Sequence, residues 1–515
     1  MDKLEETVAE ETTQQSEPAT EAPAKKQNGF LRAVGFDPVA KQAKVKTELI
    51  AGVVTFLAMA YILTVNPNQI FGAGSPYWAS AFIATALGAI VGTLLMAFFA
   101  KMPLAQASGM GLNSMLGGII GGYGGYGAAF TPGQGFMLVL ISGLIFLLLS
   151  VIKIKGKTFR ELVFDGMPVA VRGAISVGIG LFIAYIGFQQ SGVIVANQYT
   201  QVALADFTSW TASKTAVVAL VGLFLIAILD KFKVKGSVIL GILGATLLGI
   251  PFGVTDVAIL KGQEAGISWK FWDNFANFFT GDNSVFGSFV DVFHEGLKPA
   301  SVSIFTVIML IITMCMIDMF DTMGTIVGCC GGNRILSDEN NKPYNYGKIM
   351  MSDAIATCTG AMLGTSTVTT FVEAGAGVAA GGRTGLTALT TAGMFFLAMF
   401  ALPLFAMIPS AATASALIYV GVLMMKSNVK NIDFSDAINA VSAFLTVVIM
   451  LLSYSITKGI GVGMISYTLM STVAYLVDLI RYAITKKDKP VWKVSVVAIV
   501  VSLLFCVYFF VPATI

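Results

Sequence analysis

The chain has 515 residues, of which 56% are hydrophobic and 12% are charged, and its mean hydropathy is +0.80. Soluble domains carry about 25% charged residues, so this composition excludes a soluble globular protein. The net charge of +3 is too small to indicate a nucleic-acid partner. The five cysteines lie in or beside apolar runs and the one histidine lies in a loop, so we predict no metal site, disulfide or other cofactor.

The first 45 residues lack the apolar core of a cleavable signal peptide. Residues 1–24 hold seven acidic residues and one lysine, a composition typical of a disordered tail. Residues 25–46 are basic, and apolar side chains among them, such as Phe30 and Phe36, suit a short amphipathic stretch on the membrane surface. We therefore expect a disordered tail over residues 1–46, first acidic and then basic.

Long apolar runs follow, each about 20 residues in length where complete, which is the length of a membrane-spanning helix. The runs do not alternate between apolar and polar residues, so a β-barrel is disfavoured. The sequence thus predicts an all-α polytopic membrane protein. The predicted segments are 48–66, 77–100, 106–121, 134–152, 168–188, 214–231, 235–253, 302–328, 349–364, 372–381, 385–407, 411–426, 436–456, 459–482 and 491–512. Asn66-Pro67 is interpreted as the outer end of the first segment.

Basic residues cluster between these segments in a one-sided way. If every segment crosses the membrane once, the clusters all lie on the side of the N-terminus, and the positive-inside rule places that side in the cytoplasm. The stretch 254–300 has six acidic residues and three lysines and is predicted to be an extracellular loop. We expect a multi-pass protein of the cell (plasma) membrane. The basic clusters are 25–46, Lys101, 153–160, 231–235, 334–348, Arg383, 426–430 and 481–489.

The loop 254–300 divides the membrane region into a first transmembrane repeat, 47–253, and a second, 301–482. Seven segments precede the loop, so the second half begins on the opposite side of the membrane. The third segment of each half is interrupted by Gly and by Ser or Thr, as in the stretches 103–114 and 364–383. Paired interruptions of this kind point to the central site of a secondary transporter with an inverted repeat. The segment 483–515 adds an extra transmembrane helix unless a neighbouring piece is re-entrant.

Two acidic residues of the segment 302–328 share a helical face. Asp318 and Asp321 are three residues apart, and Thr325 follows at a spacing of four. A carboxylate near the bilayer centre costs about 3 kcal/mol on insertion scales, so two on one face indicate a polar cavity. Asp353, in contrast, is interpreted as an N-terminal cap of the next helix.

The interrupted stretches supply the remaining candidate residues. Glu373 is predicted at the start of a half-helix, where N–H groups tolerate a carboxylate and can hold the edge of a polar substrate. Asn113 offers both a donor and an acceptor, and Gly111 lets the backbone approach a ligand. Phe371 is either a ring that stacks on a planar substrate or plain packing.

Four stretches of the sequence resemble the signatures of the azaguanine-type adenine/guanine/hypoxanthine permeases of the nucleobase–ascorbate transporter superfamily. The resemblance covers about residues 36 to 482. The run Ala105-Gln-Ala-Ser-Gly109 departs from the usual Leu-Ala-Pro-Gly and leaves the preference between adenine and guanine/hypoxanthine open. The four stretches are Thr47 to Pro67, Met110-Gly-Leu-Asn113, Asp318-Met-Phe-Asp321-Thr-Met-Gly-Thr325, and Gly364 to Leu386.

The resemblance implies a seven-plus-seven transmembrane inverted repeat with core and gate domains and broken third and tenth segments. It implies proton-coupled uptake of a purine nucleobase, with a homodimer typical of the superfamily. It also makes Gly111, Asn113, Asp318, Asp321 and Glu373 the positions for substrate binding and coupling. Chemically, a carboxylate accepts from ring N–H groups, and a desolvated carboxylate can carry the coupling proton.

Other functions are weighed against this one. A transporter of the same fold for another nucleobase, such as xanthine or uracil, remains the alternative. An anion carrier is disfavoured because Asp318, Asp321 and Glu373 would repel an anion. A channel needs a continuous stripe of polar residues, which no predicted segment supplies. An enzyme needs a nucleophile–base set or metal ligands, and the sequence shows neither, so no catalytic residue is predicted.

Overall fold

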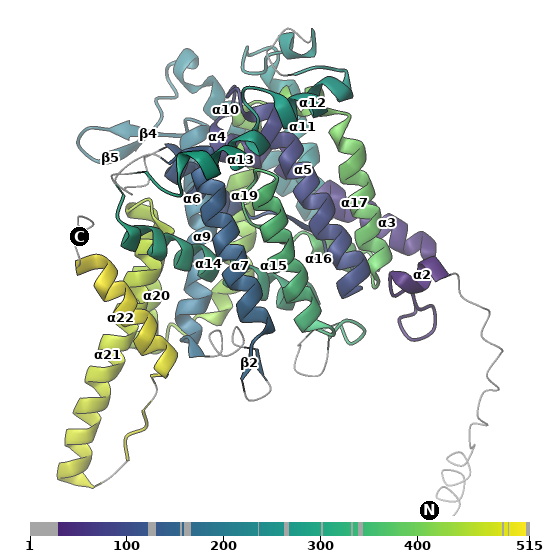
Figure 1. Ribbon diagram of the computed structural model, residues 1–515. Coiled ribbons are helices and arrows are strands. Elements are labelled where there is room, and N and C mark those ends of the chain that lie inside the picture. The colour runs from purple at the N-terminus through teal and green to yellow at the C-terminus, as the bar shows by residue number, and fades with distance from the viewer. Residues whose placement is uncertain are drawn as a thin grey trace, which may run out of the picture.

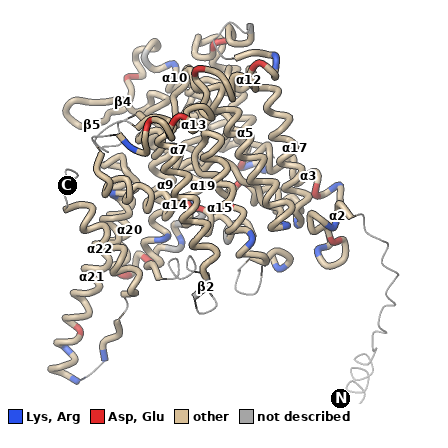
Figure 2. Tube along the Cα trace, in the orientation of Figure 1, with Lys and Arg blue, Asp and Glu red and all other residues tan. Residues whose placement is uncertain are grey.

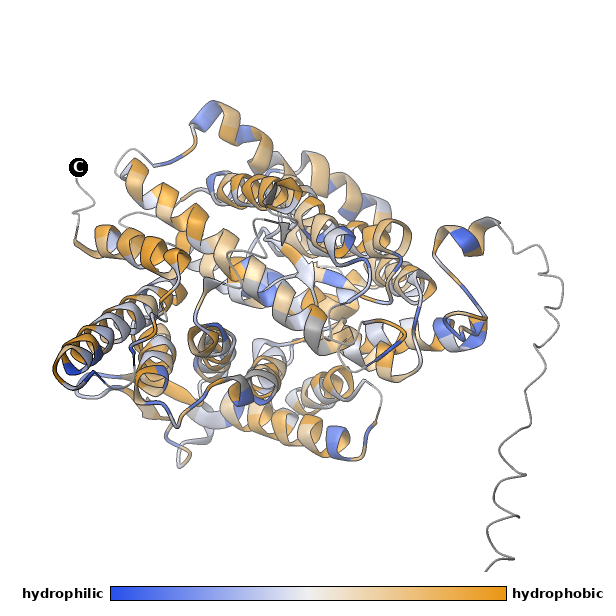
Figure 3. Cartoon of the chain, turned by 90° about the horizontal axis from the view of Figure 1, so that it is seen from below, coloured by the Kyte–Doolittle hydropathy of each residue, from blue (hydrophilic) through white to orange (hydrophobic). Residues whose placement is uncertain are grey.

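The structure is a computed structural model, and the apolar runs of the sequence form its helices (Figure 1). Among the described residues, seven helices are long and apolar enough to cross a membrane. Viewed along the bundle, the helices are mostly apolar (Figure 3). The described residues are 29–121, 130–154, 157–158, 166–234, 236–261, 267–299, 302–330, 333–337, 343–486, 489–492 and 494–510.

The helices pack in two groups. In the first group, α3, α5, α7, α15 and α17 pack against one another around two short strands; in the second, α9, α10, α19, α20 and α21 pack together. The first group also contains α4, α6, α14 and α16, and the second also contains α11. The bounds in the first half are α3 Val45–Met59, α4 Ile62–Phe71, α5 Trp78–Leu95, α6 Met110–Gly121, α7 Pro132–Val151, α9 Val169–Gln190, α10 Trp210–Lys231 and α11 Ser237–Gly249. Those in the second half are α14 Ile304–Cys330, α15 Tyr346–Met362, α16 Ala374–Ala379, α17 Gly385–Met399, α18 Leu402–Ala406, α19 Ser410–Asn428, α20 Ala437–Leu452, α21 Ile456–Thr485 and α22 Val496–Phe510.

Two three-residue strands lie inside the first group. Strand β1 (Gln106–Ser108) pairs antiparallel with β6 (Val368–Thr370), and all six residues are buried. Each strand leads into a helix, β1 into α6 and β6 into α16. Backbone that is not helical survives at membrane depth only where its polar groups find partners inside the protein, and each strand supplies them for the other. We call this pair of strands the crossing.

Two short hairpins lie away from the crossing. Strands β2 (Lys153–Ile154) and β3 (Lys157–Thr158) pair with each other, as do β4 (Ile194–Asn197) and β5 (Gln201–Leu204). The C-terminal helix α22 packs against α21, and both stand at one edge of the molecule (Figure 1). The apolar run predicted at 491–512 therefore forms a helix of its own, over Val496–Phe510.

The first membrane segment differs from its prediction at Asn66-Pro67. The helix does not end there, because α4 continues through Pro67 to Phe71. The irregularity lies earlier instead, between α3 and α4 at Ala60 and Tyr61. Pro lacks an N–H and interrupts a helical ladder, but neighbouring groups inside a membrane protein can replace the lost bond.

The predicted loop 254–300 contains two short helices, α12 (Phe271–Thr280) and α13 (Val285–Glu295). They pack on α5, α7 and α15 of the first group. The contact is close, because a Cβ on Gly133 would meet the carbonyl oxygen of Ser288. The N–H of Val285 also donates to Oγ of Ser80 at 3.0 Å. This stretch is thus a helical cap on the first group of helices.

The described part of the basic N-terminal stretch, from residue 29, contains the short helix α2 (Gly29–Ala33), where the sequence predicts a disordered tail. Val34 and Phe36 are buried with Leu386 of α17, so this stretch packs on protein as well as facing outward. The guanidinium of Arg383 donates to the carbonyl of Lys41 at 3.1 Å. Residues 1–24, predicted to be disordered, lie outside the described residues.

The buried carboxylate of Glu48 fixes the start of α17. It accepts from the N–H groups of Arg383 (3.0 Å) and Thr384 (3.2 Å) and from the hydroxyl of Thr387 (2.5 Å). A carboxylate at a helix N-terminus satisfies N–H groups that have no partner within the helix and is favoured by the helix dipole. This bond set ties α3 to α17 within the first group.

The orientation stays a prediction, and it is testable on this fold. Figure 2 shows lysine and arginine at the end of the bundle that holds α2 and β2, and acidic residues near α12 and α13. We expect a cysteine at the exposed position Thr280 to react with a membrane-impermeant maleimide on intact cells. A cysteine at the exposed position Lys348 should react only after the cells are opened. The reverse pattern would place the N-terminus outside.

Candidate functional site

Glu373 stands where β6 gives way to α16, and it occupies the position just before the first residue of that helix. Its side chain is 8% exposed. Oε1 accepts a hydrogen bond of 2.5 Å from the hydroxyl of Tyr61, which lies in the irregular turn between α3 and α4. Oε2 is buried and has no hydrogen-bond partner among the described residues. One oxygen therefore holds the carboxylate in place, and the other can accept from a ligand N–H group.

Asn113 is fully buried in the first turns of α6, on the other side of the crossing. The hydroxyl of Ser366 donates to its Oδ1, and its Nδ2 donates to the carbonyl of Ser108 at 3.5 Å. The amide thus braces α6 against the residues that enter β6. An amide nitrogen carries two hydrogens, so one remains for a further acceptor.

A chain of side-chain hydrogen bonds extends this network to α4 and α5. Nδ2 of Asn66 donates to Thr85 at 2.6 Å and to Thr365 at 2.8 Å. The Thr365 hydroxyl lies 2.8 Å from that of Ser108. Asn66, interpreted from sequence as a helix end, is instead part of the polar framework of the crossing.

Asp318 and Asp321 both lie on α14, as the spacing predicts. Asp318 is fully buried, and the hydroxyl of Thr357 on α15 lies 3.1 Å from its Oδ2. The same hydroxyl is 3.1 Å from the carbonyl of Val368 in β6. Asp321 is partly exposed and interacts electrostatically with Asp353 and Glu373. The structure therefore brings all three predicted acids to the region of the crossing.

Asp353 is a residue whose role the sequence did not predict. It does not cap α15, because that helix begins at Tyr346 and Asp353 is fully buried inside it. Its Oδ1 accepts from Nε2 of Gln106 in β1 (3.0 Å) and from the N–H of Thr370 in β6 (3.1 Å). Its Oδ2 accepts from the hydroxyl of Thr322 on α14 (2.6 Å). One carboxylate thus holds both strands, and hydrogen bonds of this charge-assisted kind are the stronger ones.

Gly111 and Phe371 flank the crossing. A Cβ on Gly111 would lie 2.9 Å from Cγ2 of Ile179, so glycine allows α6 to approach α9 of the second group. Phe371 is 4% exposed, and its N–H donates to the carbonyl of Ala105 at 3.1 Å. Its ring belongs to the main apolar core. Stacking of this ring on a substrate stays a prediction.

Comparison with known proteins gives consistent results. Residues 46–462 match the model of the permease family. The guanine/hypoxanthine permease PbuO of Bacillus subtilis is 36% identical over 433 residues, which cover 84% of this chain and 92% of that protein. The adenine permease AdeQ of Escherichia coli is 35% identical over 426 residues, which cover 83% of this chain and 87% of the relative.

Solved structures with the same fold are more distant in sequence. The transmembrane domain of the cyanobacterial bicarbonate transporter BicA superposes with a TM-score of 0.52 at 14% identity, covering 79% of this chain and 96% of that one. SLC26A9 gives a TM-score of 0.53 at 10% identity, covering 87% and 68%. These likenesses concern the fold alone. The family match and the two bacterial relatives identify the chain as a member of the permease family of nucleobase–ascorbate transporters, a multi-pass membrane permease and not an enzyme.

Proposed function

We propose that this permease takes up purine nucleobases, guanine/hypoxanthine or adenine, by proton symport, and that the crossing forms the substrate site. The main support for this proposal is the carboxylate of Glu373. It is buried beside broken backbone, fixed through Oε1 by Tyr61, and leaves Oε2 for an N–H group of the base. The names of the relatives, which are guanine/hypoxanthine and adenine permeases, support a purine substrate.

The two helix groups, each of which draws helices from both halves of the chain, support an alternating mechanism in which one group moves against the other. The first group holds the crossing and would act as the core, and the second would act as the gate. Gly111 lies at their boundary, where α6 meets Ile179 of α9. The site beside Glu373 and Asn113 would open to one side of the membrane and then to the other as one group shifts against the other.

The acids supply the coupling. Asp318 and Glu373 are buried close to the crossing, and Asp321 lies on α14 with Asp318. A carboxylate that is poorly solvated and has no cation beside it favours its protonated form. We infer that Asp318, Asp321 or Glu373 takes up the transported proton. The alternative substrate, xanthine or uracil on the same fold, is tested by the same assay with a panel of competing bases.

The experiment is uptake of radiolabelled base into proteoliposomes with an imposed pH gradient. The wild-type protein should accumulate the base against its gradient and lose this ability with an uncoupler. The amide variant of the coupling acid, among Asp318→Asn, Asp321→Asn and Glu373→Gln, should lose accumulation but keep downhill exchange. If all three variants still accumulate base, another residue or ion drives transport. Strong competition by xanthine or uracil alone would reassign the substrate.

A further inference from the structure

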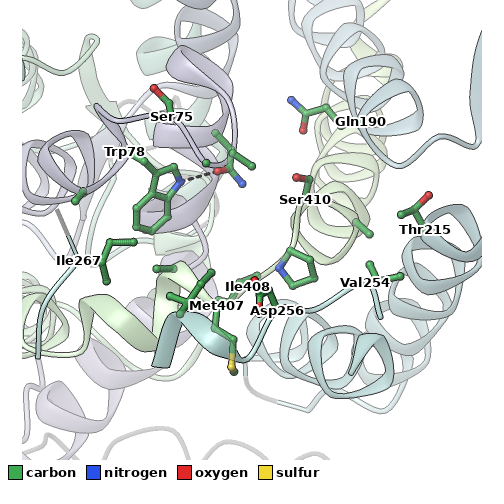
Figure 4. Close-up of a pocket in the computed structure, with 18 of the residues that line it drawn as sticks. Ser75, Trp78, Gln190, Thr215, Val254, Asp256, Ile267, Met407, Ile408 and Ser410 are labelled. Atoms are coloured by element: carbon green, nitrogen blue, oxygen red, sulfur yellow. Dashed lines mark hydrogen bonds between the residues drawn. The ribbon is translucent and has the colours of Figure 1, made fainter. Parts of the chain in front are cut away.

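A cavity of about 550 Å³ lies apart from the crossing, where the two helix groups meet at the end of the bundle that carries residues 254–261. Figure 4 shows Trp78 on one side of it and Gln190 and Ser410 on the other. Trp78 begins α5 of the first group, whereas Gln190 ends α9 and Ser410 begins α19 of the second. The volume falls in the range of about 300–1,000 Å³ typical of small-molecule sites.

The polar groups of this cavity are amides with capacity left over. Oδ1 of Asn68 accepts from the indole N–H of Trp78 at 2.7 Å, which fixes the amide and makes its Nδ2 the remaining donor. That nitrogen reaches Thr413 only at 3.5 Å. Across the cavity, Oε1 of Gln190 is buried and has no hydrogen-bond partner among the described residues. The cavity therefore presents donors and acceptors from both groups of helices.

The walls define the ligand further. Trp78 lies against Phe82 with ring centroids 5.7 Å apart, which stiffens an aromatic wall, and Ile267, Ile408 and Pro409 add apolar surface. Among the described residues that line the cavity, Asp256 is the charged one, and its carboxylate disfavours an anion. A neutral, flat heterocycle with N–H and carbonyl or ring-nitrogen edges matches amides set on apolar walls.

We propose that this cavity is a second nucleobase site, which holds the base before it reaches the crossing. The inference rests on the proposed function, because that function supplies the ligand. The two sites share a helix: Tyr61, the partner of Glu373, precedes α4, and Asn68 lies seven residues further along it, a rise of about 10 Å. The distribution of basic residues predicts that the cavity faces the cell exterior, the side from which uptake begins.

Protection of a cysteine from labelling tests the site in purified protein in nanodiscs. The variant Ser410→Cys is labelled with a hydrophilic maleimide in the presence and absence of adenine, guanine or hypoxanthine. The labelling of the parent chain, measured in the same way, is subtracted. A transported base at about four times its dissociation constant should slow labelling about fivefold, because only protein with an empty site reacts. Protection should persist in the Glu373→Gln background, because the base is held by different residues. A cysteine at Thr280, exposed on α12, should not be protected.

Gln190→Leu removes the amide and leaves an apolar side chain that is one carbon shorter. It should raise the base concentration for half-protection about fivefold to tenfold, the effect of losing one neutral hydrogen bond. The matched control Gln189→Leu, on the neighbouring exposed residue, should leave that concentration unchanged. The second site is overturned if protection disappears with Glu373→Gln, or if Gln190→Leu leaves the base concentration for half-protection unchanged.

The outcomes also separate the two proposals. A wild-type protein that takes up base into proteoliposomes but shows no protection at Ser410→Cys retains the proposed function and loses the second site. A protein that transports none of the purines overturns both, because the cavity then has no nucleobase to receive.

Discussion

Glu373→Gln should weaken purine binding by about 1.5 to 3 kcal/mol, which is the worth of a hydrogen bond to a charged group. The variant keeps an oxygen for the hydroxyl of Tyr61, so the local geometry survives. It replaces the oxygen that has no partner with an NH₂ group, which presents a donor to the N–H edge of the base. Equilibrium binding of radiolabelled base to purified protein measures the loss.

Tyr61→Phe is the informative companion to Glu373→Gln. It removes the group that holds Oε1 and leaves both carboxylate oxygens as acceptors, so binding should weaken less than in the amide variant. Both variants should be recovered from isolated membranes in amounts close to wild type, as measured by the area of the main peak in size-exclusion chromatography of the solubilised protein. An amide variant with wild-type affinity would remove Glu373 from the substrate site.

Asp353→Ala should lower the free energy of unfolding by about 2 to 4 kcal/mol and abolish transport, since buried donors lose their acceptor. These donors are the side chain of Gln106 in β1, the N–H of Thr370 in β6 and the hydroxyl of Thr322. Without the carboxylate, the two strands lose their common anchor, and Glu373 follows directly after one of them. Thermal unfolding of purified protein and uptake in proteoliposomes give the two readouts.

Asp353→Asn should be milder, because its amide oxygen can still accept from Gln106 and Thr370. Ser352→Ala is the matched control on the same helix, since the hydroxyl of Ser352 donates to Lys348 one turn back and not to the strands. Transport and stability in Asp353→Ala that equal those of Ser352→Ala would contradict the anchoring role.

The sequence predicts the helices well because burial in lipid requires long apolar runs, and these runs are local. It also marks 106–108 and 368–370 as unusual through their neighbouring Gly, Ser and Thr, and these residues form β1 and β6. Glu373 stands out in the same local way, as an acid beside such a stretch. Features that depend on a short stretch of sequence could therefore be predicted.

The predictions are wrong where the apolar run in the sequence does not coincide with the helix in the structure. The apolar run of α15 begins at Ile349, but the helix begins at Tyr346 and includes the charged Lys348, so Asp353 lies inside it and not at its end. Its partners come from residues distant in the chain, which one sequence cannot reveal. The helices α12 and α13 are apolar on one face only, so an average over residues hides them.

The crossing also constrains how the protein is made. Gln106 of β1 pairs with Thr370 of β6, a partner 264 residues further along the chain. At a synthesis rate of about 5–20 residues per second, roughly 13 to 50 s separate the appearance of the two strands at the ribosome. During this interval the first strand has inserted among apolar helices without its backbone partner. The nascent first half is thus an incomplete membrane protein that depends on water, lipid headgroups or the insertion machinery to shelter its polar backbone until the second half arrives.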